Sequence, residues 1–190
     1  MIVVPFKNDF YSYIIPPNKE EVLEHCWKSK NIEDQSFSWG SKSFSKKENI
    51  DPEGFEDVLY PSLDLFLSEI YIDNCDISIE SDLVWKNTYY KGYHQEIHSH
   101  IPSDFSCVIF LDDYDDNSSQ FYFFNENGRN TPFKLKSLCN DNRHYMDDSW
   151  AMKPEKGSII FFPSHMLHGV TPHFSEKPRT TVALNFILNN

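Results

Sequence analysis

The chain has 190 residues, 39% of them hydrophobic and 16% aromatic, a composition that indicates one globular domain and excludes a disordered chain. Its net charge of −12 disfavours nucleic acid and anionic membranes as partners. No stretch approaches the roughly 20 apolar residues of a membrane span, and the short apolar start at 1–6 lacks the basic region of an export signal. The four cysteines are far apart and fit reduced thiols, so we expect a cytoplasmic protein.

The first part of the chain carries two helical patterns. The segment 18–27 begins with the capping residue Asn18 and then places apolar residues at helical spacing. A second start signal, Asp51-Pro52-Glu53, precedes an apolar stripe over 55–70, which Pro61 should kink or split. Both stripes are interpreted as packing faces of helices.

After residue 76 the pattern changes to short β-rich runs separated by turn residues. The expected strands are Ile77 to Glu80, Leu83 to Tyr90, Phe105 to Leu111, Gln120 to Phe124, Ser158 to Phe162 and Arg179 to Leu188. Such spacing favours an antiparallel sandwich or barrel. We therefore predict a single domain over 1–190, with a helical N-terminal elaboration (1–76) and a β core (77–190).

Two histidine clusters stand out in the β-rich part. One contains His94, His98 and His100, and the other, His165 and His168, follows an apolar strand. Alternate residues of an extended strand point to the same side, and neutral imidazole is the commonest protein ligand for divalent transition metals. The clusters predict a mononuclear metal site, with Arg179, eleven residues after His168, as a neighbouring anion-binding group.

Several pieces in order resemble the iron(II)- and 2-oxoglutarate-dependent dioxygenases. They are Trp85-Lys86-Asn87, His98-Ser99-His100-Ile101-Pro102-Ser103, Ser106 to Leu111, Lys153 to Gly157, Phe161-Phe162-Pro163-Ser164, His168-Gly169-Val170 and Arg179 to Asn185. The resemblance covers roughly residues 83 to 188. It is strongest to small oxygenases with a His-x-His-Pro-like motif, and prolyl hydroxylases share the order more distantly.

The resemblance implies a double-stranded β-helix, a jelly-roll barrel like that of the cupins, with a metal near its open end. It assigns His98 as the first metal ligand and His168 as the distal one. His100 occupies the position that normally holds Asp or Glu. A carboxylate ligand could come instead from Glu96 or Asp104.

The resemblance also implies Fe(II), 2-oxoglutarate and O2 as cofactor and cosubstrates. The reaction would release succinate and carbon dioxide and hydroxylate a second substrate. Arg179 would pair with the distal carboxylate of 2-oxoglutarate, and Thr181 lies on the same side of its strand. Tyr89, Tyr90 or Asn87 could add further contacts to the cosubstrate, and we assign Tyr90 and Asn87 to it.

Two other functions fit the same residues. A cupin-type enzyme with a three-histidine metal site would keep His98, His100 and His168 and need no keto acid. A non-catalytic barrel would account for the missing carboxylate. Among the remaining polar residues, we interpret His94 and His165 as exposed or orienting, and Asn185 has no legible role.

The expected substrate is a small molecule or a side chain of a protein or peptide. The loops 112–119 and 137–149 are acidic and aromatic, and if they shape the substrate mouth they favour a neutral or cationic target. An edge strand near the N-terminus would offer a surface for pairing two subunits as a homodimer.

Overall fold

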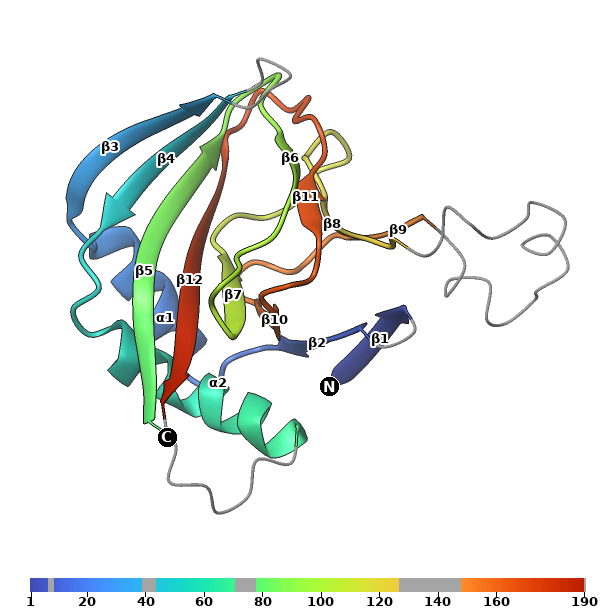
Figure 1. Ribbon diagram of the computed structural model, residues 1–190. Coiled ribbons are helices and arrows are strands. Elements are labelled where there is room, and N and C mark those ends of the chain that lie inside the picture. The colour runs from blue at the N-terminus through green and yellow to red at the C-terminus, as the bar shows by residue number, and fades with distance from the viewer. Residues whose placement is uncertain (7–8, 39–43, 71–77, 127–147, 190) are drawn as a thin grey trace, which may run out of the picture.

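The computed structural model describes residues 1–6, 9–38, 44–70, 78–126 and 148–189, and every structural statement below concerns these. They form two antiparallel sheets (Figure 1). The larger sheet runs in the order β1 (Ile2–Phe6), β2 (Asp9–Ile14), β10 (Ile159–Pro163), β7 (Phe105–Phe110), β12 (Arg179–Asn189), β5 (Ser78–Tyr89), β4 (Phe44–Ile50) and β3 (Asn31–Ser38). The smaller one runs β6 (Gln95–His98), β11 (His168–Val170), β8 (Phe121–Phe124) and β9 (Ser149–Met152).

The predicted mainly β architecture is confirmed. The strands expected from β-rich runs correspond to β5, β7, β8, β10 and β12, although the two runs expected before Tyr90 form one continuous strand from Ser78. Strands β6, β9 and β11 were not predicted, because each contains few of the β-branched and aromatic residues that indicate a strand, whereas the equally short β8 is all aromatic.

The two predicted helices are α1 (Lys19–Lys28) and α2 (Phe55–Glu69), which contact each other beside the larger sheet (Figure 1). Of the two outcomes expected at Pro61, a kink or a split, the split does not occur, because α2 continues through this residue. A helical proline loses one backbone hydrogen bond, and buried residues on both sides of it, including Phe55 and Phe66, fasten each half of this helix to the core. Trp27 of α1 is 49% exposed and does not join the packing face.

The N-terminal part is more than a helical elaboration. Besides the two helices it contributes β1 to β4, and the larger sheet incorporates them through the pairs β2–β10 and β4–β5. The helical description of 1–76 was therefore incomplete, because β1 to β4 join a sheet whose other strands come from later in the chain. The boundary near residue 76 lies outside the described residues, and the domain division stays a prediction. Strand β1 is an edge strand, and the homodimer also stays a prediction.

Alternation along the central strands separates two hydrophobic layers. On β7, Cys107 and Ile109 face the helices, whereas Val108 and Phe110 face the smaller sheet. On β10, Phe161 and Phe162 divide in the same way. The inner layer between the sheets is mostly aromatic, and this is where the candidate site lies.

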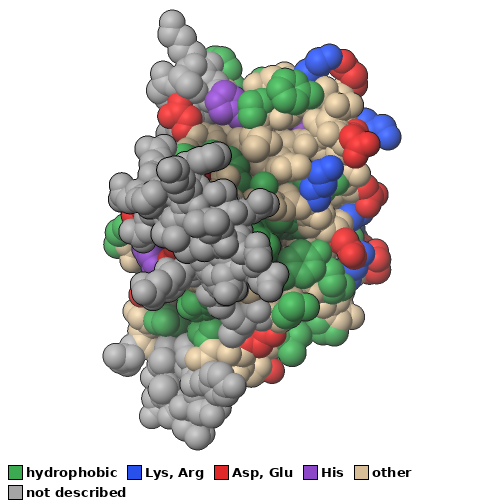
Figure 2. Space-filling view, turned by 90° about the vertical axis from the view of Figure 1, so that its right-hand side faces the viewer, with side chains coloured by type: hydrophobic (Ala, Val, Ile, Leu, Met, Phe, Trp, Pro, Cys, Tyr) green, Lys and Arg blue, Asp and Glu red, His purple; other side chains and the backbone are tan. Residues whose placement is uncertain are grey.

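The surface does not segregate its surplus of acidic residues on the face that Figure 2 shows. Acidic and basic side chains lie next to each other along one edge of that face, with hydrophobic side chains between them (Figure 2). The net charge of −12 therefore does not identify a single acidic patch there.

Replacing Phe66 with Ala should lower the free energy of unfolding by about 3–5 kcal/mol, because a buried aromatic leaves a cavity. Phe66 is 1% exposed and stacks on Phe161 with ring centroids 5.0 Å apart. Leu65, its neighbour on α2, is 45% exposed, so Leu65→Ala is the matched control and should cost less than about 1 kcal/mol. Urea denaturation measures both, and equal losses would contradict the packing described.

Candidate metal centre

Two strands and one loop bring three histidines together. His98 on β6 and His168 on β11 are directly opposite each other in the antiparallel ladder. His100 follows β6, and its backbone N–H donates to the carbonyl of Ser164 at 2.9 Å. The segment after β10 thereby fixes the position of His100 against the two strands.

The ligand nitrogens of the three histidines converge. One nitrogen from each of His98, His100 and His168 lies within 4.8 Å of the others, and the two Nε2 atoms of His100 and His168 are 3.1 Å apart. Two nitrogens bound to one divalent ion at about 2.1 Å and roughly at right angles would be about 3 Å apart. The geometry therefore fits a single transition-metal ion.

Backbone carbonyls set the tautomers of two of these rings. Nδ1 of His98 is 2.8 Å from the carbonyl oxygen of Glu96, and Nδ1 of His168 is 2.9 Å from that of Met166. A carbonyl can only accept, so each Nδ1 carries the proton and each Nε2 presents a lone pair to the centre. The donor set is thus prearranged for a metal.

Burial keeps the three imidazoles neutral, which is the form that binds metal. Loss of hydration is the main cause of a lowered pKa at all three histidines. The pKa values of His98 and His168 lie below the ordinary value, and that of His100 is lowered to about 3. Aromatic rings fix the orientations. Trp85 stacks on His100 at 5.3 Å and Phe121 stacks on His168 at the same centroid distance.

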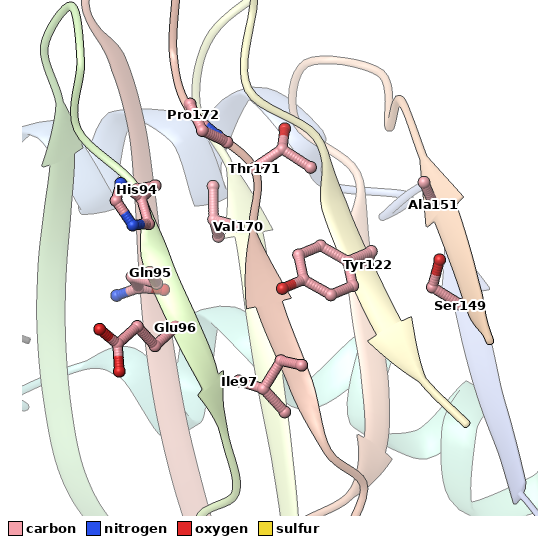
Figure 3. A pocket seen from close by; sticks show the side chains of 10 residues that line it. All are labelled: His94, Gln95, Glu96, Ile97, Tyr122, Ser149, Ala151, Val170, Thr171 and Pro172. Atoms are coloured by element: carbon pink, nitrogen blue, oxygen red, sulfur yellow. The ribbon is translucent and has the colours of Figure 1, made fainter. Parts of the chain in front are cut away.

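Neither alternative carboxylate joins this cluster. The ladder between β6 and β11 contains an irregularity that places Gln95 opposite Val170, so that Gln95 and His98, three residues apart, line the same cavity. Glu96 lines a different hollow (Figure 3). The carboxylate of Asp104 accepts the N–H of Leu188 at 2.8 Å. Within the described residues the site is made of three imidazoles.

The other candidate histidines lie apart from the cluster. His94 and Glu96 line a hollow of about 630 Å³ on the smaller sheet, together with Tyr122 and Ile97 (Figure 3). His165 is mostly exposed, with Nε2 3.7 Å from a carboxylate oxygen of Asp9. The hollow lined by His94 and Glu96 does not contain the three-histidine cluster.

Arg179 begins β12 and is buried, with 2% of its surface exposed. Its Nε donates to the hydroxyl of Ser119 at 2.9 Å, and Nη1 donates to the hydroxyl of Tyr114 at 2.6 Å. The guanidinium also lies 4.5 Å from the centre of the Tyr89 ring. Its Nη2 is buried and has no hydrogen-bond partner among the described residues, which leaves a cationic donor for an anion.

The arginine and the histidines line one cavity because of strand register. Arg179 pairs with Tyr89 and Thr181 pairs with Asn87 across β12 and β5 of the larger sheet, and all four residues line one cavity with the three imidazoles. The buried Oδ1 of Asn87 also lacks a hydrogen-bond partner in the described part of the chain. Tyr90 points away and is 44% exposed, which removes it from the candidate set in favour of Tyr89.

The enclosed cavity has a volume of about 20 Å³, room for roughly one water molecule. A dicarboxylate at this place therefore requires the lining side chains to move apart. The cavity shares Trp85, Asn87, Gln95, His98 and His100 with an adjoining hollow of about 440 Å³. That hollow connects the histidines to the outside.

Sequence reasoning missed the two residues that hold Arg179. Tyr114 and Ser119 belong to the loop 112–119, which was expected to shape the substrate mouth, but the structure places their hydroxyls on the guanidinium. No spacing rule links this loop to Arg179, since about 60 residues separate them. The other proposed mouth loop, 137–149, lies outside the described residues except at its end.

Several solved structures have a similar fold. A prolyl-4-hydroxylase from Pseudomonas putida aligns over 95% of this chain and 93% of its own, with 14% identity and a TM-score of 0.56. A viral collagen prolyl hydroxylase from Paramecium bursaria Chlorella virus-1, solved as a 2-oxoglutarate complex, aligns over 93% and 94%, with 13% identity and a TM-score of 0.55. HygX from Streptomyces hygroscopicus, solved with nickel and 2-oxoglutarate, aligns over 93% and 82%, with 10% identity and a TM-score of 0.57. They confirm the jelly-roll fold.

Residues 83–185, more than half of the chain, match the model of the family described as "Putative 2OG-Fe(II) oxygenase". The chain belongs to this family, which confirms the predicted enzyme class and its use of iron(II), 2-oxoglutarate and O2. No curated protein gave a significant match. Among the described residues, neither helix has the length and apolar character needed to cross a membrane.

Replacing His168 with Ala should weaken Co(II) binding by more than about a hundredfold, because one of three converging ligands is lost. Visible absorption of the Co(II)-loaded protein measures this directly. The matched control is His165→Ala, three residues away and outside the cluster, which should bind Co(II) like the unmodified protein. Equal binding by the two variants would exclude His168 as a ligand.

Proposed function

We propose that the protein hydroxylates a second substrate with His98, His100 and His168 as iron ligands and Arg179, Thr181 and Asn87 as the 2-oxoglutarate site. The observation that carries this proposal is the buried Nη2 of Arg179, which has no partner among the described residues and lies in the same cavity as the three converging imidazoles. A site for metal alone would have no use for it.

Each group has a physical role in this arrangement. The bound metal would supply activation of O2 coupled to decarboxylation of the keto acid. Arg179 would bind the distal carboxylate, and the hydroxyl of Thr181, on the same strand face, would add a hydrogen bond. Because Tyr89 and Phe121 line the cavity, they would exclude water from the reacting groups.

The three-histidine set also agrees with a cupin-type enzyme that does not use 2-oxoglutarate. The single observation in its favour is that His100 replaces the usual carboxylate and no other carboxylate of the described residues joins the cluster. The membership in the 2OG-Fe(II) oxygenase family and the unpaired guanidinium nitrogen favour the first proposal.

We further infer a cytoplasmic location and a small-molecule or peptide side-chain substrate. Cys26 and Cys107 are free and buried, in agreement with reduced thiols, whereas Cys75 and Cys139 lie outside the described residues. Burial raises the pKa of Cys26 to about 12, so this thiol stays protonated and unreactive.

Anaerobic titration of the Fe(II)-loaded protein with 2-oxoglutarate should produce a weak visible charge-transfer band that saturates, because chelation of the metal by a 2-oxo acid creates it. In Arg179→Lys and Arg179→Ala the half-saturating concentration should rise at least about tenfold, since a charged hydrogen bond is worth about 1.5–3 kcal/mol. Co(II) binding by the same variants establishes that they are folded. Bound iron without any band would favour the cupin-type enzyme.

Tyr114→Phe should raise the half-saturating 2-oxoglutarate concentration about two- to tenfold, because the guanidinium loses one of the two hydrogen bonds that orient it. Tyr90→Phe provides the control, since Tyr90 does not line the cavity, and it should leave the titration unchanged. An effect of Tyr90→Phe as large as that of Tyr114→Phe would contradict the placement of these residues.

A further inference from the structure

The hollow beside the three histidines has an unusual charge for this protein. Its volume of about 440 Å³ suits a small molecule. Besides the imidazoles, the one ionisable side chain that lines it among the described residues is that of Lys47, and no described carboxylate does. The pocket is thus locally cationic although the chain has a net charge of −12. We call it the Lys47 pocket.

Strand register directs Lys47 into this pocket. On β4, Lys47 is paired with Asn87 of β5, and Asn87 is paired with Thr181 of β12. The three residues form a row across one face of the sheet, the face of the candidate metal site. Arg179 begins the same strand as Thr181, so the two cationic groups lie on the same side of the molecule but line different cavities.

Trp85 connects Lys47 to the metal ligands. The Nζ of Lys47 lies 4.7 Å from the Trp85 ring centre, and the His100 ring stacks on Trp85 with centroids 5.3 Å apart. A single aromatic ring therefore lies between the ammonium of Lys47 and the candidate metal ligand His100. A molecule bound by Lys47 would therefore have its reacting carbon a few bonds away from the group that the ammonium binds.

Lys47 has no acidic partner in the described part of the chain. Its neighbour Lys46, whose side chain lies on the other face of β4, forms an ion pair with Glu48 at 3.0 Å. Loss of hydration lowers the pKa of Lys47, as expected for an ammonium that is partly buried without a counter-charge. Binding an anion would restore the missing interaction.

The acidic loop that favoured a neutral or cationic substrate does not line the Lys47 pocket. The carboxylate of Asp112 accepts the N–H of Thr180 at 2.7 Å, and that of Asp115 accepts the hydroxyl of Ser175 at 2.6 Å. Tyr114 and Ser119 of the same loop hold Arg179. The loop thus contacts the arginine side of the site, and none of its residues lines the Lys47 pocket.

We propose that the Lys47 pocket receives the second substrate and that this substrate is a small molecule with a carboxylate or phosphate group, which pairs with Lys47. This inference rests on the proposed function, because the pocket matters only if the adjoining site performs oxygenation. The hydroxyls of Ser99 and Ser103 line the pocket and supply further donors to such an anion. The Trp85 ring supplies an apolar wall for the part of the substrate between this anionic group and the reacting carbon.

The test uses protein loaded with Zn(II) and 2-oxoglutarate, so that the arginine site is already filled and no turnover occurs. Four probes of the same chain length, butanoate, butyl phosphate, butanamide and butylammonium, are titrated by calorimetry. Butanoate, butyl phosphate or both should bind, and the amide and the ammonium should bind at least about tenfold more weakly. Preference for one of the two anions would identify the group that the natural substrate carries.

Variants of two adjacent lysines on β4 distinguish a specific effect of Lys47 from the general effect of removing a positive charge. Lys47→Gln should weaken anion binding at least about tenfold, and Lys47→Arg should retain it. Lys46→Gln, the adjacent position on the other strand face, should have no effect. Absence of anion binding, equal binding of all four probes, or equal effects of Lys46→Gln and Lys47→Gln would overturn the proposal.

The charge-transfer titration with 2-oxoglutarate distinguishes the two proposals. If the band forms normally in Lys47→Gln while anion binding is lost, Lys47 serves the substrate, as we propose. If Lys47→Gln instead raises the 2-oxoglutarate requirement, Lys47 serves the cosubstrate and the inference is wrong while the enzyme class stands. Absence of the band in the unmodified protein would remove the proposed function and, with it, the basis of this inference.

Discussion

The structure depends on the burial of one guanidinium group between two sheets. A buried charge without partners costs several kcal/mol, and Arg179 is 2% exposed. Hydroxyls of Ser119 and Tyr114 satisfy two of its nitrogens, and the Tyr89 ring lies against its plane. The remaining nitrogen has no partner in the described residues. The fold thus maintains a partly satisfied cation whose energy improves when an anion binds.

The same reasoning extends to the whole cavity. Three neutral imidazoles would leave a bound divalent ion with its full charge, whereas a carboxylate at position 100 would remove one unit. Arg179 and Lys47 add two cationic groups around this centre, and no carboxylate of the described residues lines either cavity. The interior is therefore positive within an acidic protein, which suits a dianionic cosubstrate and, as we propose, an anionic second substrate.

Much of the architecture was predictable from local pattern. Both helices follow from periodicity and from Asn18 or Asp51-Pro52 start signals, and β5, β7, β8, β10 and β12 follow from β-rich runs. The short strands β6 and β11 were not predicted, although they carry His98 and His168, because they contain few of the β-branched and aromatic residues that indicate a strand, unlike the all-aromatic β8. Of the kink or split expected at Pro61, the split does not occur, since packing of both halves of α2 outweighs one lost hydrogen bond.

The sequence by itself indicated the candidate site: His98, His100, His168 and Arg179 were singled out from residue type and order, and the structure brings them to one cavity. Only the tertiary structure decided which neighbours act with them. An irregular ladder places Gln95 instead of Glu96 in the cavity, and strand direction selects Tyr89 over Tyr90. Register between β4 and β5 brings in Lys47 from outside the recognisable motifs. Residue type is a local property, whereas facing and register are set by pairing between strands that lie far apart in the chain.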